Sequence, residues 1–385
     1  MHHTVTARSI MDDFAVSTGL TDNSFEPRRY LWTDAFAVCN YLQLYRQSGE
    51  KKLLQLALKL VDQVHLTLGK HHRDSEYHGW LSRLDDAQAK LHPTRGGLRI
   101  GKRLNERQPD EAFDDHLEWD RDGQYFHYLT KWMHALNRVS QVTGKSTYNE
   151  WALELAKTAH AAFTYTSAGG SKRMYWKMSV DLSRPQVASM GQHDPLDGLA
   201  TCLRLAATAK SFPDTPAVLS LDNEIAELAA MCAGQNWITD DPLGIGGLLS
   251  NANTLVQLIA GHHLHETSRV EALLLDIELS MQAYVSHNQL NLPAEYRLAF
   301  RELGLAIGLH AICRMQKVIE QQPENFTHLG KLRSRLNSLS RFRDLDEIID
   351  NFWSGAEHRA VNSWQEHADI NNVMLATSLA PDGYL

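Results

Sequence analysis

The chain has 385 residues, of which 43% are hydrophobic, and 38 Lys and Arg against 46 Asp and Glu give it a formal net charge of −8. This is the composition of a soluble globular protein, and the acidic balance excludes a general nucleic-acid binder, because neutralising phosphates requires clustered basic side chains. No apolar stretch approaches the roughly 18–20 residues of a membrane helix, so we expect no membrane partner.

The N-terminus and the cysteines indicate a cytoplasmic protein. Asp12 and Asp13 lie in the segment where a signal peptide would need an uninterrupted apolar run. The cysteines are far apart and sit among aliphatic residues, which favours buried free thiols in a reducing compartment over disulfides or a metal site. The four positions are Cys39, Cys202, Cys232 and Cys313.

Apolar residues recur at spacings of three and four along most of the chain, which predicts a mostly helical protein. Only the run near 173–180 alternates with a period of two. In chain order, we expect a helix over 6–17 and then helices in pairs. The first helices of the pairs are expected to begin near Tyr30, Asp122, Asp194, Leu243, Glu295 and Glu366. The second helices are expected near 51–68, 148–163, 217–237, 269–285 and 329–352.

A sequence repeat supports this pairing. Residues 48–50 (Ser-Gly-Glu) and 143–145 (Thr-Gly-Lys) are offset by 95 residues and are followed by the same pattern of apolar positions. In each copy a glycine can adopt the left-handed conformation that ends a helix, and a second helix starts a few residues later. Eleven such helices, with 6–17 as the twelfth, make six hairpins. We therefore predict an all-α fold, an (α/α)6 toroid formed as a single domain over 1–385.

Loop lengths indicate which face of the ring carries function. Connections within a pair are minimal, whereas those leading to the next first helix are long: 69–121, 164–193 and 353–365. Long ordered loops tend to carry function, and free N–H groups at the first helices suit hydroxyl-rich or anionic ligands. The segment 69–121 is expected to fold over the opening as a lid.

The chain resembles the six-hairpin glycosidase-like superfamily, which includes unsaturated glucuronyl hydrolases and the N-acylglucosamine 2-epimerase group. The resemblance is one of architecture over nearly the whole chain, carried by the Ser/Thr-Gly-x-x-x-Leu/Tyr-x-x-x-Ala-Leu repeat and by Trp- and Asp-rich starts of inner helices. It implies a site in the cavity at the inner-helix ends, lined by aromatic residues, with carboxylates or histidines as acids and bases.

The richest polar cluster is 114–122, which leads into Tyr125 and His127. Crowded carboxylates raise one another's pKa, as a general acid requires, so Glu118 and Asp120 are catalytic candidates. Trp119 and Tyr125 are candidates to bind substrate. Helix capping and solvation are alternatives for the acids, and His127 is a catalytic or a satisfied core histidine.

A second cluster surrounds the start of the next inner helix. Pro195 suits a first helical turn, so Asp194 is interpreted as the N-cap and as a candidate to bind substrate, with His193 just before it. His193 and Asp197 are four residues apart and can share one face as a base and its partner. Gly198 indicates close packing or space for a ligand.

Further candidates lie at the other inner-helix starts. Near the last one, His367 and Asp369 are two residues apart, so at most one of them points into a cavity. Indole rings stack on sugar faces, and an arginine can clamp a carboxylate. The remaining candidate binding residues are Trp32, Asp34, Tyr296, Arg297 and Trp364.

Several other chemistries are excluded. The sequence has no Gly-rich phosphate loop, no Gly-x-Ser-x-Gly elbow and no His-Glu-x-x-His zinc helix. The histidines at 71–72 and 262–265 are interpreted as solvated, so we expect no metal and no cofactor. The acidic pairs at 85–86 and 114–115 are too weak a motif to support an isoprenoid cyclase.

The leading hypothesis is a cytoplasmic carbohydrate-active enzyme that binds a small-molecule carbohydrate. In a hydrolase, one of Asp120 and Asp197 protonates the leaving oxygen while a second carboxylate activates water. In a 2-epimerase or isomerase, His193 and either His127 or His367 exchange a proton next to a carbonyl. The alternative is a non-catalytic binding or scaffold protein on the same ring, and a homodimer is left open.

Overall fold

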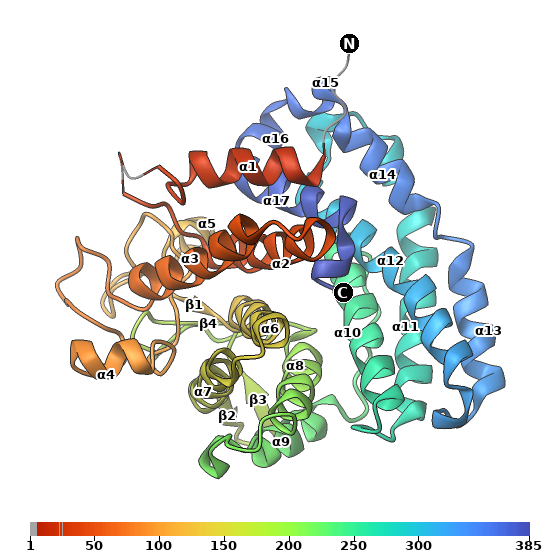
Figure 1. Ribbon diagram of the computed structural model, residues 1–385, viewed down its shortest axis with the longest axis horizontal. Helices are drawn as coiled ribbons and strands as arrows, with labels where there is room; N and C mark the ends of the chain where they lie inside the picture. The colour runs from red at the N-terminus through yellow and green to blue at the C-terminus, as the bar shows by residue number, and fades with distance from the viewer. Residues whose placement is uncertain (1–5, 23, 25) are drawn as a thin grey trace. The chain divides into compact units, whose positions relative to one another are not determined.

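The computed structural model describes residues 6–22, 24 and 26–385 (Figure 1). Helices account for 64% of it, which confirms the all-α class. The chain divides into two compact units. One comprises Phe14–Ala233, and the other comprises Gly234–Leu385 with the residues up to Asp13. A single domain over 1–385 remains a prediction.

The unit Phe14–Ala233 holds most of the long helices of the N-terminal half. Its helices are α2 (Leu31–Ser48), α3 (Lys51–Leu68), α4 (Asp86–Leu91), α5 (Asp115–Asp120), α6 (Phe126–Thr143), α7 (Ser146–Phe163), α8 (Asp194–Ala209) and α9 (Asp222–Cys232). Helix α1 (Ala7–Ser17), predicted over 6–17, crosses the boundary between the units in the sequence. Helix α2 packs against α6, and α6 against α8, while α3, α7 and α9 each cover one of these inner helices.

The two repeated glycines end helices as predicted. Gly49 follows α2 with φ 72° and Gly144 follows α6 with φ 70°, both in the left-handed region. In each case the glycine N–H bonds back to a carbonyl of the last helical turn. A residue with a Cβ would be strained there, so glycine sets the point at which each hairpin turns.

The loops between the helices of this unit contain short strands. The strands are β1 (Gln124–Tyr125), β2 (Thr164–Thr166), β3 (Lys172–Met174), β4 (Lys177–Met178) and β5 (Pro185–Val187). β4 pairs antiparallel with β1 and β5, and β2 pairs with β3. The period-two run near 173–180 thus coincides with β3 and β4. Because β1 takes up the two residues before α6, that helix begins four residues after the predicted start.

The second unit is helical throughout its described part. Its helices are α10 (Pro242–Ala260), α11 (Thr267–Ser286), α12 (Ala299–Gln321), α13 (Leu329–Ser340), α14 (Leu345–Ser354), α15 (Ala356–Arg359), α16 (Asn362–Gln365) and α17 (Ala368–Leu379). α12 packs against α10, α14 and α17. A Cβ added at Gly246 would lie 2.0 Å from the Gly304 carbonyl oxygen, so glycines allow α10 and α12 to approach this closely.

Two predicted helices have different bounds. The helix expected over 329–352 is divided into α13 and α14 by a turn, within which Arg341 reaches Glu278 of α11 at 3.2 Å. The helix expected over 217–237 is shorter, because 217–219 form a 3-10 turn and Gly234 has φ 71°.

The expectation that no stretch approaches the length of a membrane helix is wrong for α10. Its 19 residues carry no charge and have a mean hydropathy of 1.3, which suffices by length and composition alone. However, 61% of this stretch is buried by other parts of the protein, and α10 packs on α11 and α12. It therefore serves as a core helix of its unit.

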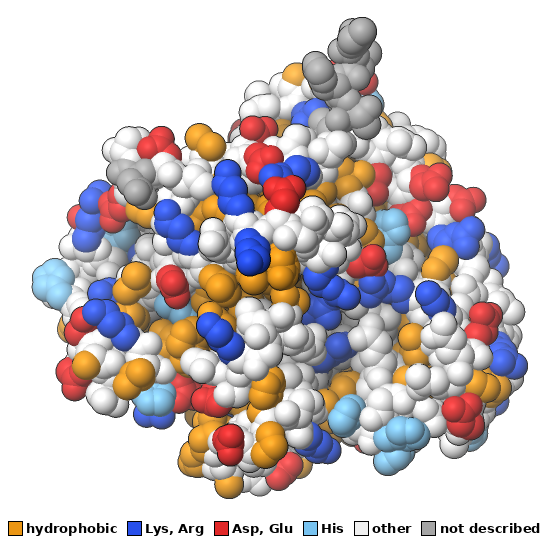
Figure 2. Space-filling view, viewed as in Figure 1, with side chains coloured by type: hydrophobic (Ala, Val, Ile, Leu, Met, Phe, Trp, Pro, Cys, Tyr) orange, Lys and Arg blue, Asp and Glu red, His pale blue; other side chains and the backbone are white. Residues whose placement is uncertain are grey.

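Three of the four cysteines are buried, as predicted. Cys39, Cys202 and Cys232 are buried free thiols, but Cys313 is exposed, so the expectation of burial is wrong there. It falls on a solvent-facing position of α12 despite its aliphatic neighbours in the sequence. Figure 2 shows acidic, basic and hydrophobic side chains mixed on the face in view.

Candidate active site

The candidate active site is built where α6 and α8 begin. Lys131 contacts Asp197 near the starts of the two helices, and Gln141 contacts Thr208 near their ends, so the helices run parallel with their starts aligned. Their N-terminal ends therefore lie side by side, where free N–H groups and the helix dipoles favour anionic or hydroxyl-rich ligands.

Asp197, one turn into α8, is held as a carboxylate. Lys131 Nζ donates to both of its oxygens, at 2.8 and 2.7 Å, and Thr130 Oγ1 donates to Oδ2 at 2.6 Å. Burial by itself raises the pKa of Asp197, but the charge of Lys131 and these hydrogen bonds outweigh burial and lower the pKa below its ordinary value. Asp197 is therefore ionised at neutral pH.

The pKa of Asp194, the first residue of α8, is shifted in the opposite direction from that of Asp197. It is buried, and its Oδ2 has no hydrogen-bond partner among the described residues. Burial, and then the negative charge of Asp197, raise the pKa of Asp194 to about 7. Because positions 194 and 197 are one helical turn apart, their side chains share a face of α8.

His127 is the third titratable group of this cluster. Its Nδ1 lies 3.8 Å from Asp194 Oδ1, and most of its ring is buried. Burial, helped by the charge of Lys131, lowers the pKa of His127 to about 4. The imidazole is therefore neutral at pH 7 and offers a ligand one hydrogen-bond donor and one acceptor.

Aromatic rings line the cluster on the side of α2. The Trp32 ring lies 5.3 Å from the Tyr128 ring and 6.1 Å from the His127 ring, centroid to centroid. The hydroxyls of Tyr30 and Tyr128 are 2.7 Å apart and hydrogen-bonded. These rings provide an apolar wall with polar groups at its edge, as expected for binding a sugar ring.

A second aromatic group leads from the cluster towards solvent. The Tyr125 ring is 5.2 Å from that of His127 and 5.3 Å from that of Trp176. Trp119 packs edge-on against Trp176 at 5.0 Å and remains 48% exposed. The structure thus connects the predicted binding residues Trp32, Trp119 and Tyr125 through one chain of ring contacts.

The arrangement offers acid/base chemistry. Two carboxyl groups one turn apart have pKa values shifted in opposite directions, so around neutral pH Asp194 is partly protonated while Asp197 carries charge. Such a pair can donate a proton from one group and stabilise positive charge with the other. No group of three or more His, Cys, Asp or Glu side chains within the described residues is placed to hold a metal ion.

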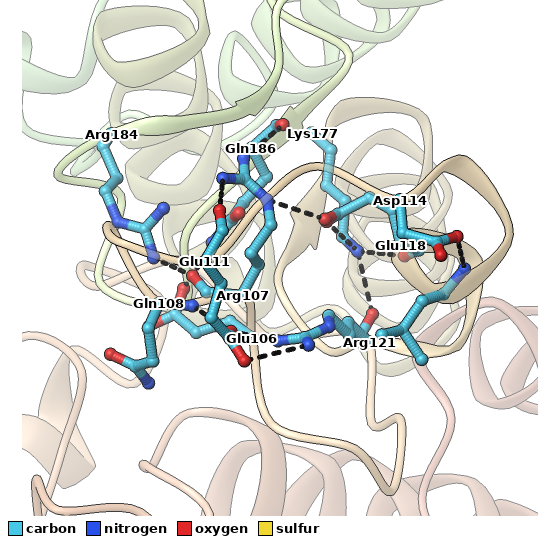
Figure 3. Close-up of polar contacts among 11 residues, drawn as sticks. Glu106, Arg107, Gln108, Glu111, Asp114, Glu118, Arg121, Lys177, Arg184 and Gln186 are labelled. Carbon is cyan, nitrogen blue, oxygen red and sulfur yellow. Dashed lines mark hydrogen bonds and ion pairs between the residues drawn. The ribbon is translucent and has the colours of Figure 1, made fainter.

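Glu118 lies in a different polar network (Figure 3). Lys177 Nζ donates to Glu118 Oε1 at 2.9 Å and to the carbonyls of Glu118 and Arg121, while Arg107 Nε donates to Glu118 Oε2 at 3.2 Å. Arg107 also reaches the Gln186 carbonyl at 3.0 Å. Both carboxylate oxygens of Glu118 are occupied, and the network fastens α5 to strands β4 and β5.

Two other predicted acids and a predicted histidine have different surroundings. Asp34 accepts from Arg29 at 3.2 Å and from the Tyr30 backbone N–H at 3.0 Å, which fixes the start of α2. Asp120, the last residue of α5, is exposed. His193 directly precedes α8 and is partly exposed.

The remaining candidates belong to the unit Gly234–Leu385. Arg297 is buried and forms a bidentate pair with Glu302, with N to O distances between 2.6 and 3.1 Å. Trp364 is buried 5.5 Å from Trp353, whose indole N–H donates to Glu302. Tyr296, by contrast, is 77% exposed.

The last two candidates lie at the start of α17. His367 is exposed, with its ring 5.7 Å from that of Phe300, and Asp369 is also exposed. Catalytic or binding roles for these residues remain predictions.

Sequence reasoning missed two residues of the cluster and misplaced a third. Lys131 lies one turn after His127 on the same face of α6, and this spacing could have identified it, together with its neighbour Thr130. The interpretation of Asp194 as an N-cap is wrong. His193 occupies that position, and no side chain caps the helix. Gly198 packs against Phe126, since a Cβ there would lie 3.0 Å from that ring, and so leaves no space for a ligand.

No family model matches the sequence, and a sequence search finds no match among curated proteins. A solved structure of a GH76 α-mannanase from Bacteroides thetaiotaomicron is similar, with a TM-score of 0.57 and 8% identity over 98% of this chain and 96% of that one. A cellobiose 2-epimerase from Bacillus thermoamylovorans gives a TM-score of 0.45 at 11% identity, and a sugar epimerase from a ruminal bacterium gives 0.40 at 10%. Each of these two covers 87% of this chain and 85% of its own.

The likeness to the mannanase shows the fold. The chain has the (α/α)6 toroid of the six-hairpin glycosidase-like proteins, and the predicted architectural resemblance is confirmed.

Proposed function

We propose that this protein is a carbohydrate-active enzyme that hydrolyses a glycosidic bond, with Asp194 as the general acid and Asp197 as its ionised partner. The observation that carries this proposal is the opposite pKa shift of two carboxyls one helical turn apart. Both lie beside the aromatic chain that begins at Trp32 and Tyr125. The fold shared with a GH76 α-mannanase is consistent with this chemistry.

Asp194 and Asp197 have different roles in this reaction. Asp194 donates its proton to the glycosidic oxygen as the bond from that oxygen to the anomeric carbon breaks. The charged Asp197 carboxylate stabilises the positive charge that develops on the sugar, and the water that adds to the anomeric carbon releases a proton to solvent, from which Asp194 is reprotonated. Lys131 and Thr130 hold Asp197 in place and stabilise its negative charge while positive charge develops on the sugar.

The pKa of His127 favours hydrolysis over epimerisation. An isomerase needs a histidine that takes a proton from carbon, and a base works best when its pKa lies near the working pH. The pKa of His127 is lowered to about 4, which makes the ring a weak proton acceptor. We therefore assign His127 to substrate binding, where its neutral ring can hydrogen-bond a sugar hydroxyl.

The test is a turnover assay on purified protein with α-linked mannooligosaccharides and cellobiose, which follows the release of reducing ends. The parent is expected to hydrolyse at least one substrate class, and Asp194→Asn is expected to lose about 10²–10⁴-fold in kcat. Asp222→Asn, an exposed aspartate at the start of α9, is the matched control and should behave like the parent. Saccharide binding without turnover in the parent would contradict the proposal and support a binding protein.

A further inference from the structure

The segment that follows α3 closes on itself and forms a hollow outside the carboxylate pair. The Leu81 N–H bonds to the Gly69 carbonyl at 2.9 Å, and the His71 N–H bonds to the Gly79 carbonyl at 3.0 Å. The hollow measures about 480 Å³. Side chains that line it include Lys70, His71, Tyr77, His78, Trp80 and Arg83.

Several polar groups that face this hollow have no hydrogen-bond partner among the described residues. Neither imidazole ring, His71 or His78, forms a hydrogen bond with any residue in the described part of the chain, and the same is true of the Tyr77 hydroxyl. Lys70 Nζ lies 4.0 Å from an Asp86 carboxylate oxygen and 4.6 Å from the centre of the Trp80 ring. These groups combine donors and acceptors around one volume, which is the pattern needed by a ligand with many hydroxyls.

An aromatic side chain completes the lining. Tyr77 is 68% exposed, and its ring lies 5.7 Å from that of His71. Trp80, which also lines the hollow, is buried, with its indole N–H donated to Asp86 at 3.0 Å and the Lys70 ammonium 4.6 Å from the centre of its ring. Trp80 is therefore fixed in place, while the exposed Tyr77 ring offers a surface on which a sugar can stack.

The backbone at the rim is strained. Arg83 has φ 57°, in the left-handed region that residues with a side chain seldom adopt, and its N–H bonds to the Trp80 carbonyl at 3.0 Å. Its guanidinium binds Asp181 at 3.3 Å, yet the side chain is 78% exposed, which leaves other N–H groups free. Strain of this kind tends to occur at functional positions.

The hollow is also tied to the start of α6. Arg99 donates from Nε to the Lys70 carbonyl at 3.0 Å and from NH1 to Asp122 at 2.8 Å. Asp122 directly precedes Gly123 and strand β1, which leads into α6. One buried guanidinium thus connects the hollow to the segment that carries His127 and Lys131.

We propose that this hollow is a second saccharide-binding site, separate from the carboxylate pair, in which a sugar ring stacks on Tyr77 and its hydroxyls bind Lys70, His71 and His78. The choice of a saccharide as ligand rests on the proposed function. The site holds a second part of the substrate or a neighbouring chain and takes no part in bond cleavage.

The test is calorimetric binding of α-mannobiose and of cellobiose, measured in the Asp194→Asn background so that no substrate is consumed. Two classes of site are expected for the sugar that binds. Adding Tyr77→Ala should weaken one class about three- to tenfold and leave the other unchanged. Leu91→Ala, which shortens a side chain of similar exposure on α4, is the control and should change neither class.

A second readout reports the site directly. The side-chain NMR signals of His71 and His78 should shift on titration with the sugar that binds, and less so in Tyr77→Ala. Unshifted signals, or equal binding by the parent and Tyr77→Ala, would overturn the second site even if the enzyme is active. Shifted signals in a parent without turnover would support the hollow and overturn only the proposed hydrolysis.

Discussion

Two lysines in the unit Phe14–Ala233, the buried Lys177 and the partly buried Lys131, bind carboxylates in different ways. Lys177 makes three hydrogen bonds, to the Glu118 carboxylate and to two backbone carbonyls, and Arg107 occupies the other Glu118 oxygen. Lys131 also binds a buried carboxylate, that of Asp197, through both oxygens. The two ion pairs differ in the groups that lie beside them.

Beside Asp197 stands a second carboxyl, Asp194, with an oxygen that lacks a partner in the described part of the chain. In the Glu118 network both carboxylate oxygens are bound, and the buried side-chain oxygen without a partner among the described residues is the amide Oε1 of Gln186. A buried carboxylate whose hydrogen bonds are saturated fixes structure, whereas an unsaturated carboxyl costs stability and indicates a function. Saturation of the carboxyl oxygens, more than the presence of charge, distinguishes the two clusters.

The largest expected effect is on turnover at the unsaturated cluster. Asp197→Asn removes the charge that stabilises the transition state and should lower kcat by about 10²–10³-fold. The amide retains the shape of the side chain, so circular dichroism should show a folded protein. Steady-state kinetics on the substrate identified for the parent measures the loss, and turnover within tenfold of the parent's would remove Asp197 from the mechanism.

A substitution in the saturated Glu118 network should lower the stability of the protein. Lys177→Met leaves Glu118 buried with one of its two cations missing, which typically costs about 3–5 kcal/mol of unfolding free energy. Urea unfolding measures this cost. At temperatures where the variant remains folded, its kcat should stay near that of the parent, and a loss of kcat as large as that of Asp197→Asn would show that both clusters serve catalysis.

Asp194 should destabilise the fold at high pH. Its pKa is raised from an ordinary 3.8 to about 7, so the folded state holds a proton that the unfolded state releases. The stability due to the protonated form is fully present below pH 4 and is lost as the pH rises through 7. Asp194→Asn should therefore be more stable than the parent above pH 7, by up to about 4 kcal/mol. Parallel melting curves for the two proteins from pH 5 to 9 would contradict this.

A smaller effect, on the pH dependence of activity, is expected from substituting Lys131. Lys131→Met removes the charge that lowers the pKa of Asp197, so the acidic limb of the pH–activity profile should move up by about 1–3 units. Lys177→Met is the matched control, and its acidic limb should stay in place. The full pH dependence of kcat distinguishes the two lysines, and an unmoved limb in Lys131→Met would show that Lys131 does not set the charge of Asp197.

Periodicity and glycine spacing were sufficient to predict the helical hairpins. Gly49 and Gly144 lie in the left-handed conformation that the repeat predicts, and α3 has the predicted bounds 51–68. Helix boundaries that depend on tertiary contacts could not be predicted. Strand pairing delays the start of α6, and the turn before α14 is accompanied by the contact of Arg341 with Glu278.

The candidate site was predicted in part. Asp194, Asp197, His127, Trp32 and Tyr125 were named from sequence, and the structure brings them together. Lys131 was overlooked because a lone lysine on a polar helix face resembles any solvated one. Its role depends on the parallel packing of α6 against α8, which cannot be predicted from the sequence of either helix alone. Glu118 was given catalytic weight because its cations, Lys177 and Arg107, are distant in the sequence.

The central claim is that the two carboxyls of α8 titrate in different pH ranges, Asp194 well above Asp197. The most direct measurement is a ¹³C NMR titration of the aspartate carboxyl carbons in the parent, with Asp194→Asn used to assign the signal. The structure predicts that the Asp194 carboxyl titrates near pH 7 while that of Asp197 remains ionised down to below pH 4. An Asp194 carboxyl that titrates at or below pH 4 would contradict the account.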